Sequence, residues 1–242
     1  MIDIHSHILP GIDDGARNLS EALTMLQMAV DSGVTTQVLT PHIDRAKYGN
    51  NRDNLVKSFM CFKEHVDAKN LPIKLLLAAE LRIAPEIMRM VMTDEVPCLG
   101  TYQGQKTFLL EFPRGDIPFG SENLVKWLLA RDYLPIIVHP ERNSHFLAQR
   151  KKLQAFVDLG CHLQITACSL TGKFGAEVQC MAEQLLVARQ VSAIASDCHN
   201  TKGRSPDLAQ GFERALSILS KHEAEDLVTL MPNALTHENA FH

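Results

Sequence analysis

Short apolar runs alternate with longer amphipathic stretches along almost the whole chain, and this alternation most limits how it can fold. The predicted strands cover residues 2–5, 36–40, 73–80, 107–112, 135–139, 162–166 and 192–196. The predicted helices lie between them, at residues 19–32, 51–68, 84–93, 121–131, 146–158, 175–189, 206–220 and 223–230. Apolar strands separated by helices indicate a parallel sheet that helices cover. No linker or repeat divides the chain, so we predict one domain over residues 1–242.

Two predicted helices carry recognisable start signals. Asn18 followed by Glu21 predicts a capping box at the start of the first helix. Ser205 followed by Pro206 predicts an N-cap and a proline at the first helical position of a later one. These signals support the helical assignment of the stretches that follow them.

Histidines and acids mark the ends of the predicted strands. His5 and His7 are two residues apart at the end of the first strand, so in extended backbone their side chains point to the same face. The other strands end at or just before His42, Glu80, Glu111, His139, Asp197 and His199. Neutral imidazole is the commonest metal ligand among side chains. We therefore interpret these residues as one metal site built from several strand ends.

The donor set predicts more than one metal ion. With Asp14 from the loop after the first strand, the candidates number nine, whereas one zinc ion usually takes four ligands. Imidazole and carboxylate without thiolate suit manganese, iron or zinc, in a cluster of two or three ions. Each residue alone also has an ordinary interpretation as a solvated or structural group. Glu80 and Glu111, for example, could be held by salt bridges, but the joint pattern favours metal.

The wide distribution of the candidate ligands also favours one sheet architecture over another. Barrel enzymes gather their sites at the carboxyl ends of all their strands. An open doubly wound sheet would instead gather its site at a single crevice. Ligands from the first strand to the last fit a closed or distorted barrel better.

Two arginines lie close to the predicted metal site. Arg142 follows His139 by three residues, and Arg204 follows His199 by a short polar loop. A guanidinium offers a fork of donors that matches phosphate oxygens. Beside metal ions, the pair predicts a phosphate monoester as substrate, although either could be a surface arginine.

Cys198 belongs to a competing motif. Together with Arg204 and Ser205 it matches C-x5-R-S, the phosphate-binding loop of cysteine-dependent tyrosine phosphatases. Thr201 stands where such loops commonly carry glycine, and Asp197 would raise the pKa of the neighbouring thiol. We therefore keep a Cys198-dependent mechanism only as an alternative.

Bulk properties exclude other classes of protein. The formal net charge of −4 argues against a general nucleic-acid binder. No apolar run approaches the roughly 18 residues of a membrane span, and no secretory signal is visible. The six cysteines form no C-x-x-C pair, which is typical of reduced thiols in a cytoplasmic protein.

Six short motifs carry a resemblance to a known family. They are I-D-I-H-S-H-I-L-P-G-I-D-D-G at 2–15, T-P-H at 40–42, A-E-L at 79–81, L-E-F at 110–112, H-P-E-R-N at 139–143 and A-S-D-C-H-N at 195–200. With them the chain resembles the PHP (polymerase and histidinol phosphatase) superfamily. The resemblance is greatest to its bacterial manganese-dependent tyrosine phosphatases of capsule and exopolysaccharide operons. Cys198 departs from the relatives, which often carry Met or another apolar residue there.

The resemblance implies a fold and a set of roles. It implies an α/β fold, a distorted (β/α)7 TIM-like barrel called the PHP fold, with a trinuclear metal site. One ion would be held by His5, His7, Glu80 and Asp197; a second by Glu80, Glu111 and His139; a third by Asp14, His42 and His199. Arg142 and Arg204 would bind the phosphoryl group.

The function expected from the resemblance is metal-dependent hydrolysis of phosphotyrosine. The implied substrate is the tyrosine-rich tail of a membrane-bound bacterial tyrosine autokinase that controls polysaccharide export. Two alternatives stay open beside the Cys198 mechanism. One is a small-molecule phosphatase such as one acting on histidinol phosphate, and the other is a catalytically silent metal-binding scaffold that docks on a kinase.

Overall fold

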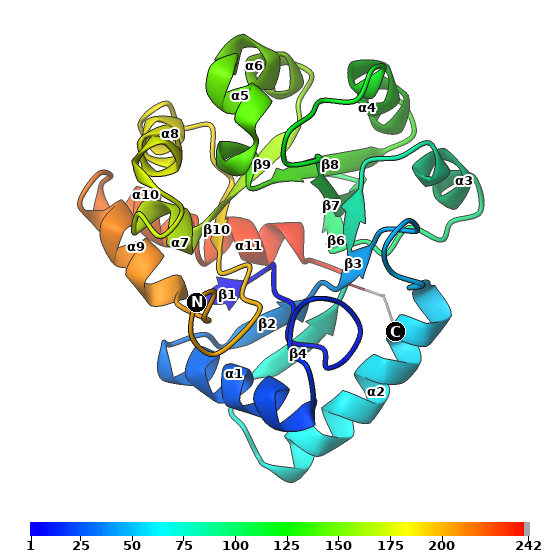
Figure 1. Cartoon of the computed structure of the whole chain (residues 1–242), viewed down its shortest axis with the longest axis vertical. Helices are drawn as coiled ribbons and strands as arrows, with labels where there is room; N and C mark the ends of the chain where they lie inside the picture. Colours follow the sequence, from blue (N-terminus) through cyan, green and yellow to red (C-terminus); the bar gives the residue numbers. More distant parts are fainter. Residues whose placement is uncertain (240–242) are drawn as a thin grey trace.

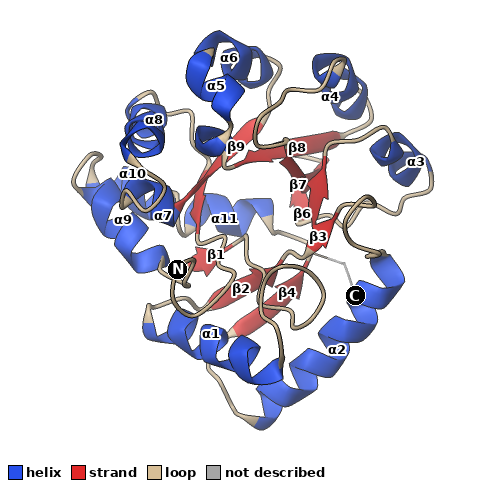
Figure 2. Cartoon of the chain, in the orientation of Figure 1, coloured by secondary structure: helices blue, strands red, loops and turns tan. Residues whose placement is uncertain are grey.

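The computed structural model describes residues 1–239, so the last three residues of the predicted domain lie outside the described part. It places a ring of strands inside a ring of helices (Figure 1, Figure 2). The strands are β1 (Ile2–Asp3), β2 (Thr36–Leu39), β3 (His42–Ile43), β4 (Lys74–Leu77), β5 (Glu80–Arg82), β6 (Gly100–Tyr102), β7 (Gln105–Glu111), β8 (Tyr133–Val138), β9 (His162–Thr166) and β10 (Ala193–Ala195).

Two parallel ladders run around the ring. One has the order β1-β2-β4 and the other the order β10-β9-β8-β7-β5-β3. Only Thr40 and Pro41 separate β2 from β3, and only Ala78 and Ala79 separate β4 from β5. The predicted strand at 73–80 is therefore broken in two. Each break shifts the chain from one ladder into the other, so the two ladders form one ring.

The ring closes between the first and last parallel strands. An isolated parallel bridge joins Ser6 to Cys198, and the amide of His7 donates to the carbonyl of Cys198 at 2.9 Å. The amide of Asp197 donates to the carbonyl of His5 at 2.9 Å. The edge strands of an open sheet would lie apart, whereas these lie side by side. The mixed α/β fold with a parallel sheet is thus as predicted, in the form of a distorted barrel.

Strand β6 was not predicted. It pairs antiparallel with β7, which follows it after a turn of two residues, Gln103 and Gly104. Both have positive φ, 50° and 84°, as a two-residue hairpin of the primed type requires. A three-residue strand carries too little periodicity to be found in a sequence, although the glycine is a turn signal.

Helices surround the ring of strands, and in the described part of the chain none is both long and apolar enough to cross a membrane. They are α1 (Leu19–Asp31), α2 (Arg52–Ala68), α3 (Glu86–Met92), α4 (Ser121–Leu129), α5 (Ser144–Ala148), α6 (Arg150–Asp158), α7 (Ala167–Leu170), α8 (Ala176–Val187), α9 (Leu208–Leu216), α10 (Lys221–Asp226), α11 (Leu230–Leu235) and the 3-10 helix η1 (Pro140–Arg142). The predicted helix at 146–158 is two helices, because Gln149 adopts φ −138° and ψ 73°. Helix α7 was not predicted.

The predicted helix starts are only partly right. The side chain of Asn18 accepts from the amide of Glu21 at 3.0 Å, as a cap should. The Glu21 carboxylate, however, accepts from Arg17 rather than completing a capping box. The predicted start at Ser205 and Pro206 is wrong, since α9 begins at Leu208.

A contact network explains why α9 starts later than predicted. The Asp207 carboxylate accepts from the Ser205 hydroxyl at 2.6 Å and from the Lys173 ammonium at 2.7 Å. It therefore makes no capping bond to the first turn of α9. The polar segment before α9 is held to the loop before α8, and the helix forms only beyond it.

Two apolar clusters hold the molecule together and leave one end of the barrel free. A small cluster fills the barrel, with Ile4, Val38, Leu109 and Ile136 among its members. Helix α11 covers one end of it, where the Thr107 hydroxyl donates to the carbonyl of Leu235 at 2.7 Å (Figure 1). A larger cluster lies between the strands and the outer helices. The carboxyl ends of the strands are left for polar side chains.

Candidate metal centre

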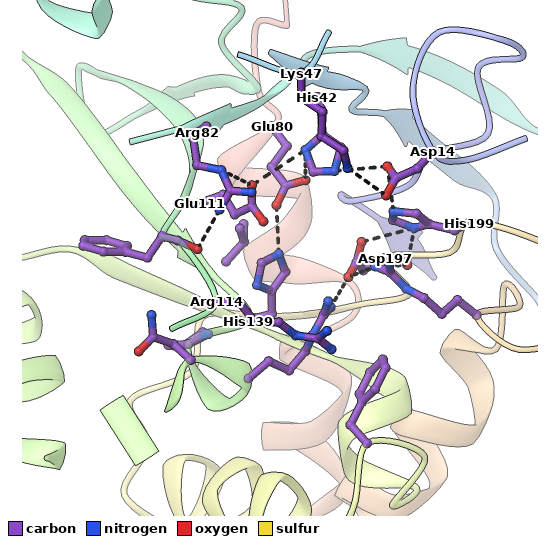
Figure 3. A pocket seen from close by; sticks show the side chains of 17 residues that line it. Asp14, His42, Lys47, Glu80, Arg82, Glu111, Arg114, His139, Asp197 and His199 are labelled. Atoms are coloured by element: carbon purple, nitrogen blue, oxygen red, sulfur yellow. Dashed lines mark hydrogen bonds and ion pairs between the residues drawn. The ribbon is translucent and has the colours of Figure 1, made fainter. Parts of the chain in front are cut away.

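Side chains from the ends of the parallel strands converge on one pocket of about 210 Å³ (Figure 3). Seven of the nine predicted ligands line it: Asp14, His42, Glu80, Glu111, His139, Asp197 and His199. His5 and His7 are fully buried and contact Glu80 and Asp197. The structure therefore brings all nine together at the carboxyl end of the barrel.

The innermost group has the spacing of atoms bound to a single ion. The Nε2 atoms of His5 and His7 are 3.2 Å apart, and Glu80 Oε2 lies 3.3 Å from each. Asp197 Oδ1 lies 3.4 Å from both nitrogens. Ligand atoms about 2.1 Å from a shared ion lie about 3.0–3.4 Å from one another. These four residues are the first group that the family resemblance implies.

A second group forms around the other side of Glu80. His42 Nδ1 lies 2.9 Å from Glu80 Oε2 and 3.8 Å from Glu111 Oε2. These three residues can present ligand atoms within 4.8 Å of one another. The resemblance places His139 rather than His42 with the two glutamates. In the structure His139 Nε2 is 2.8 Å from the other oxygen of Glu80, at the edge of this group.

A third group lies nearest the solvent. Asp14 Oδ1 is 3.4 Å from His42 Nε2 and 3.6 Å from His199 Nε2, as the resemblance implies for these three residues. His7 joins them, since its ring centroid is 3.9 Å from that of His199. His7 thus lies between this group and the innermost one.

The cluster contains polar atoms that protein groups alone do not satisfy. Buried side-chain atoms without a hydrogen-bond partner include His42 Nδ1, Glu80 Oε2, Glu111 Oε2, Asp197 Oδ1 and His199 Nε2. A buried polar atom without a partner costs about 1–3 kcal/mol, and more if it is charged. Bound divalent cations would coordinate these atoms and remove that cost. The residues therefore fit a metal site with nitrogen and oxygen ligands.

The pKa of Glu111 also supports a bound cation in the cluster. Burial, together with the charge of Glu80, raises the pKa of Glu111 to about 7. Carboxylates this close repel one another unless a proton or a cation lies between them. A divalent cation at this position would keep both glutamates ionised.

Two residues that the sequence analysis missed orient the inner histidines. His5 Nδ1 lies 2.7 Å from Gln164 Oε1, and His7 Nδ1 lies 2.7 Å from Asp13 Oδ2. An oxygen that accepts a hydrogen bond from Nδ1 favours the tautomer with its proton there, which leaves Nε2 free as a ligand. Burial disfavours the Asp13 charge, but the contact with His7 outweighs it and lowers the pKa of Asp13 to about 2. Gln164 could have been noticed in the sequence, because it is a polar side chain between two apolar residues of strand β9.

Arg142 and Arg204 both reach the pocket and both contact Asp197. Arg204 Nη2 donates to Asp197 Oδ2 at 2.5 Å, and Arg142 Nη1 pairs with the same oxygen. The Phe174 ring stacks on the Arg142 guanidinium, 4.7 Å from the ring centroid. The Nε atom of each arginine is buried without a partner. Each of these two pocket-lining arginines therefore keeps an N–H donor that no protein group satisfies.

Three further cations line the pocket, and the sequence analysis missed them: Lys47, Arg82 and Arg114. Arg82 Nε lies 3.2 Å from Glu111 Oε2, and Lys47 Nζ lies 3.6 Å from Asp14 Oδ2 (Figure 3). The spacing of Arg82 from Glu80 was a usable signal. Both residues lie on β5 two positions apart, and such side chains of a strand point to the same face.

The geometry opposes the Cys198 alternative. The Cys198 side chain is fully buried and belongs to the large apolar cluster, and it does not line the pocket. Burial, reinforced by the charge of Asp3, raises the pKa of the thiol well above its usual range. A neutral thiol without access to the pocket is no nucleophile. All six cysteines lie in the described part of the chain, and all are free thiols.

The parallel barrel and the cluster at its carboxyl end define an α/β barrel with a candidate multinuclear metal site. The family described as capsular polysaccharide synthesis, CpsB/CapC, matches residues 1–237. The chain belongs to this family.

Individual relatives match over nearly full length. The chain is 32% identical over 240 residues to the tyrosine-protein phosphatase YwqE of Bacillus subtilis, covering 99% of this chain and 90% of that protein. It is 25% identical to the tyrosine-protein phosphatase CpsB of Streptococcus agalactiae, over 94% of each.

Solved structures agree with the sequence relatives. A chain from the crystal structures of YwqE from Bacillus subtilis and CpsB from Streptococcus pneumoniae, described as unique metal-dependent tyrosine phosphatases, superposes with a TM-score of 0.90. It is 28% identical, and the match covers 98% of this chain and 95% of that one. An amidohydrolase from Mycoplasma synoviae shares the fold alone, with a TM-score of 0.62 at 13% identity, over 97% of this chain and 87% of that one.

Proposed function

We propose that this protein is a metal-dependent protein-tyrosine phosphatase that serves capsular or exopolysaccharide synthesis. Its substrate is phosphotyrosine on the tail of a bacterial tyrosine autokinase, and it acts in the cytoplasm. The observation that carries the proposal is the convergence of nine candidate metal ligands with two arginines, seven of the nine in the walls of one pocket and His5 and His7 buried beside it. The names of the relatives support it, since they are tyrosine-protein phosphatases and one is described as metal-dependent.

The cofactor in this proposal is a cluster of two or three divalent ions, with manganese first and iron or zinc as substitutes. His5, His7, Glu80 and Asp197 would hold the inner ion. Glu111, His139, Asp14, His42 and His199 would complete the cluster. When bound, such ions polarise a phosphoryl group and lower the pKa of a water molecule that attacks it.

The arginines would bind and orient the phosphoryl group. Asp197 fixes the position of both guanidinium groups, and Phe174 supports that of Arg142. Their free N–H donors would bind the non-bridging oxygens, where negative charge increases as phosphorus is attacked. Because the fork geometry is fixed before substrate arrives, little reorganisation is needed during the reaction.

Phosphotyrosine suits this set of residues because its leaving group is a phenol. A tyrosine phenol has a pKa of about 10, so it departs with less protonation than an alkyl alcohol. The pocket then needs no dedicated general acid. Cys198 is buried and does not line the pocket, so it is not placed to form a covalent phosphoenzyme.

The experiment compares two substrates on protein purified and loaded with Mn²⁺. We expect a higher kcat/KM for phosphotyrosine peptides than for histidinol phosphate. A preference for histidinol phosphate would instead support a small-molecule phosphatase of the same superfamily. A metal-loaded preparation that is inert toward every aryl phosphate would indicate a silent scaffold.

A further inference from the structure

An apolar hollow of about 470 Å³ lies between α3 and α4, outside the catalytic pocket. Its walls include Ile83, Pro85 and Met88 on one side, and Phe119, Leu124 and Trp127 on the other. Figure 1 shows α3 and α4 as neighbouring helices on one flank of the barrel. A concave apolar surface of this size is typical of a ligand site.

Residues that are close in sequence line the hollow and the catalytic pocket, in two different loops. Arg82 lines the pocket, and the next residue, Ile83, lines the hollow. Likewise Arg114 lines the pocket, and Pro118 in the same loop lines the hollow. The first loop follows β5, which begins at the candidate ligand Glu80, and the second follows β7, which ends at the candidate ligand Glu111. Each of these two loops therefore places one residue in the wall of the pocket and another in the wall of the hollow.

The rim of the hollow exposes side chains that a free protein normally buries. Phe119 is fully exposed, and Met88 at the opposite wall is 40% exposed. Burying an aromatic side chain removes about 150–250 Å² of surface from water, so an uncovered phenylalanine beside a hollow is a candidate contact for a partner.

We propose that this hollow binds an apolar, preferentially aromatic, side chain of the peptide substrate, close in sequence to the phosphotyrosine. This inference rests on the proposed function, and it adds a second point of recognition. The phosphoryl group is held in the cationic pocket, whose walls include Arg82 and Arg114, and the neighbouring side chain packs against Phe119.

The size of the hollow favours a peptide side chain over a second copy of the protein. A stable interface between two folded subunits buries about 800 Å² on each. A hollow of about 470 Å³ accommodates one or two large side chains. Because the loops after β5 and β7 contribute residues to both cavities, its occupant is expected to belong to the molecule whose phosphate is in that pocket.

The test compares Phe119→Ala with Met92→Ala, a matched control. Met92 is 71% exposed at the end of the same α3 but does not line the hollow. Three substrates are used: p-nitrophenyl phosphate, a phosphotyrosine peptide with glycine flanks, and one with an aromatic residue near the phosphotyrosine. In Phe119→Ala we expect KM for the aromatic peptide to rise on the order of tenfold. We expect kcat/KM for p-nitrophenyl phosphate to stay unchanged, and Met92→Ala to alter neither.

Two results would overturn the inference and leave the proposed function intact. One is an unchanged KM for the aromatic peptide in Phe119→Ala. The other is a lower oligomeric state of Phe119→Ala in light scattering, which would assign the hollow to a second copy of the chain. If the unaltered protein hydrolysed no phosphotyrosine substrate at all, the proposed function itself would be contradicted, and the inference that rests on it would fall with it. The p-nitrophenyl phosphate and peptide rates of the unaltered protein separate these cases.

Discussion

Asp197 joins the ligand cluster to the arginines, because its two oxygens face different partners. Oδ1 lies 3.4 Å from the Nε2 atoms of both inner histidines, whereas Oδ2 accepts from Arg204 and Arg142. Burial opposes ionisation, but the nearby positive charges outweigh it and lower the pKa of Asp197 well below its usual range. These positive charges therefore favour the ionised form of the carboxylate. It couples the position of a candidate metal ligand to that of the two arginines that we propose bind the phosphoryl group.

Removing one guanidinium should impair turnover more than metal binding. We expect Arg142→Ala to lower kcat by roughly 10²–10³-fold, the usual cost of losing a donor to transition-state charge. Arg142→Lys is the matched control, since it keeps the charge and loses the fork. Its rate should lie between those of Arg142→Ala and the unaltered protein. Metal content measured in parallel should be retained, and an unchanged rate would exclude Arg142 from the site.

Replacing the buried thiol should have little effect on catalysis. We expect Cys198→Ala to keep most of the activity, because Cys198 packs in the apolar cluster and does not line the pocket. Steady-state rates on an aryl phosphate and a thermal unfolding curve check this. Loss of turnover in a folded, metal-loaded Cys198→Ala protein would restore the thiolate mechanism.

Some of the site's residues could be read from the sequence, and others could not. His5 and His7, like Glu80 and Arg82, follow from the two-residue period of a strand. Asp13 could not be separated from its neighbour Asp14, because both are acids in one loop. Only the fold shows that one contacts the Nδ1 atom of His7 and the other faces the pocket.

The loop after β1 passes very close to His7, one of the candidate metal ligands. A Cβ atom on Gly15 would lie 1.9 Å from the carbonyl oxygen of His7 and 2.5 Å from its Cβ. The amide of Ala16 donates to that same carbonyl at 2.9 Å, so the loop is tied directly to the histidine. Glycine at this position therefore allows the loop to bring Asp13 and Asp14 to the cluster.

A methyl group at Gly15 should displace His7. We expect Gly15→Ala to weaken metal binding by roughly 10–100-fold, in the range seen when the support of a ligand is lost. Gly49→Ala is the control, because an added Cβ there meets nothing within 4 Å. Metal titration of both variants checks this, and equal affinities would show that the loop tolerates the shift.

Some element boundaries were predicted correctly, and others were missed because local backbone geometry sets them. Strand β9 was predicted at its observed bounds, residues 162–166. The break in the strand at 73–80 was not, because Ala78 and Ala79 continue its apolar pattern. That break is functional in the proposed account, since Glu80 begins β5 at the position from which it reaches the cluster.

The barrel as a whole depends on contacts between residues nearly 200 positions apart. Its first and last parallel strands are joined by an isolated bridge, by backbone hydrogen bonds beside His5, His7 and Asp197, and by the amide of Ser196, which donates to the Asp3 carboxylate at 3.0 Å. The strand–helix alternation predicted a parallel sheet, and the spread of the candidate ligands favoured a barrel, but no sequence pattern showed which residues close the ring at this seam. In the proposed account, metal bound by residues from both sides of the seam would add to its closure.

Metal content measured together with turnover is the most direct test of the central claim. Protein as purified is analysed for its elements and assayed on an aryl phosphate. It is then stripped with a chelator, assayed again and reloaded with Mn²⁺. We predict two or three divalent ions per chain, loss of turnover after stripping and recovery after reloading. Full turnover by a folded chain free of metal would contradict the account.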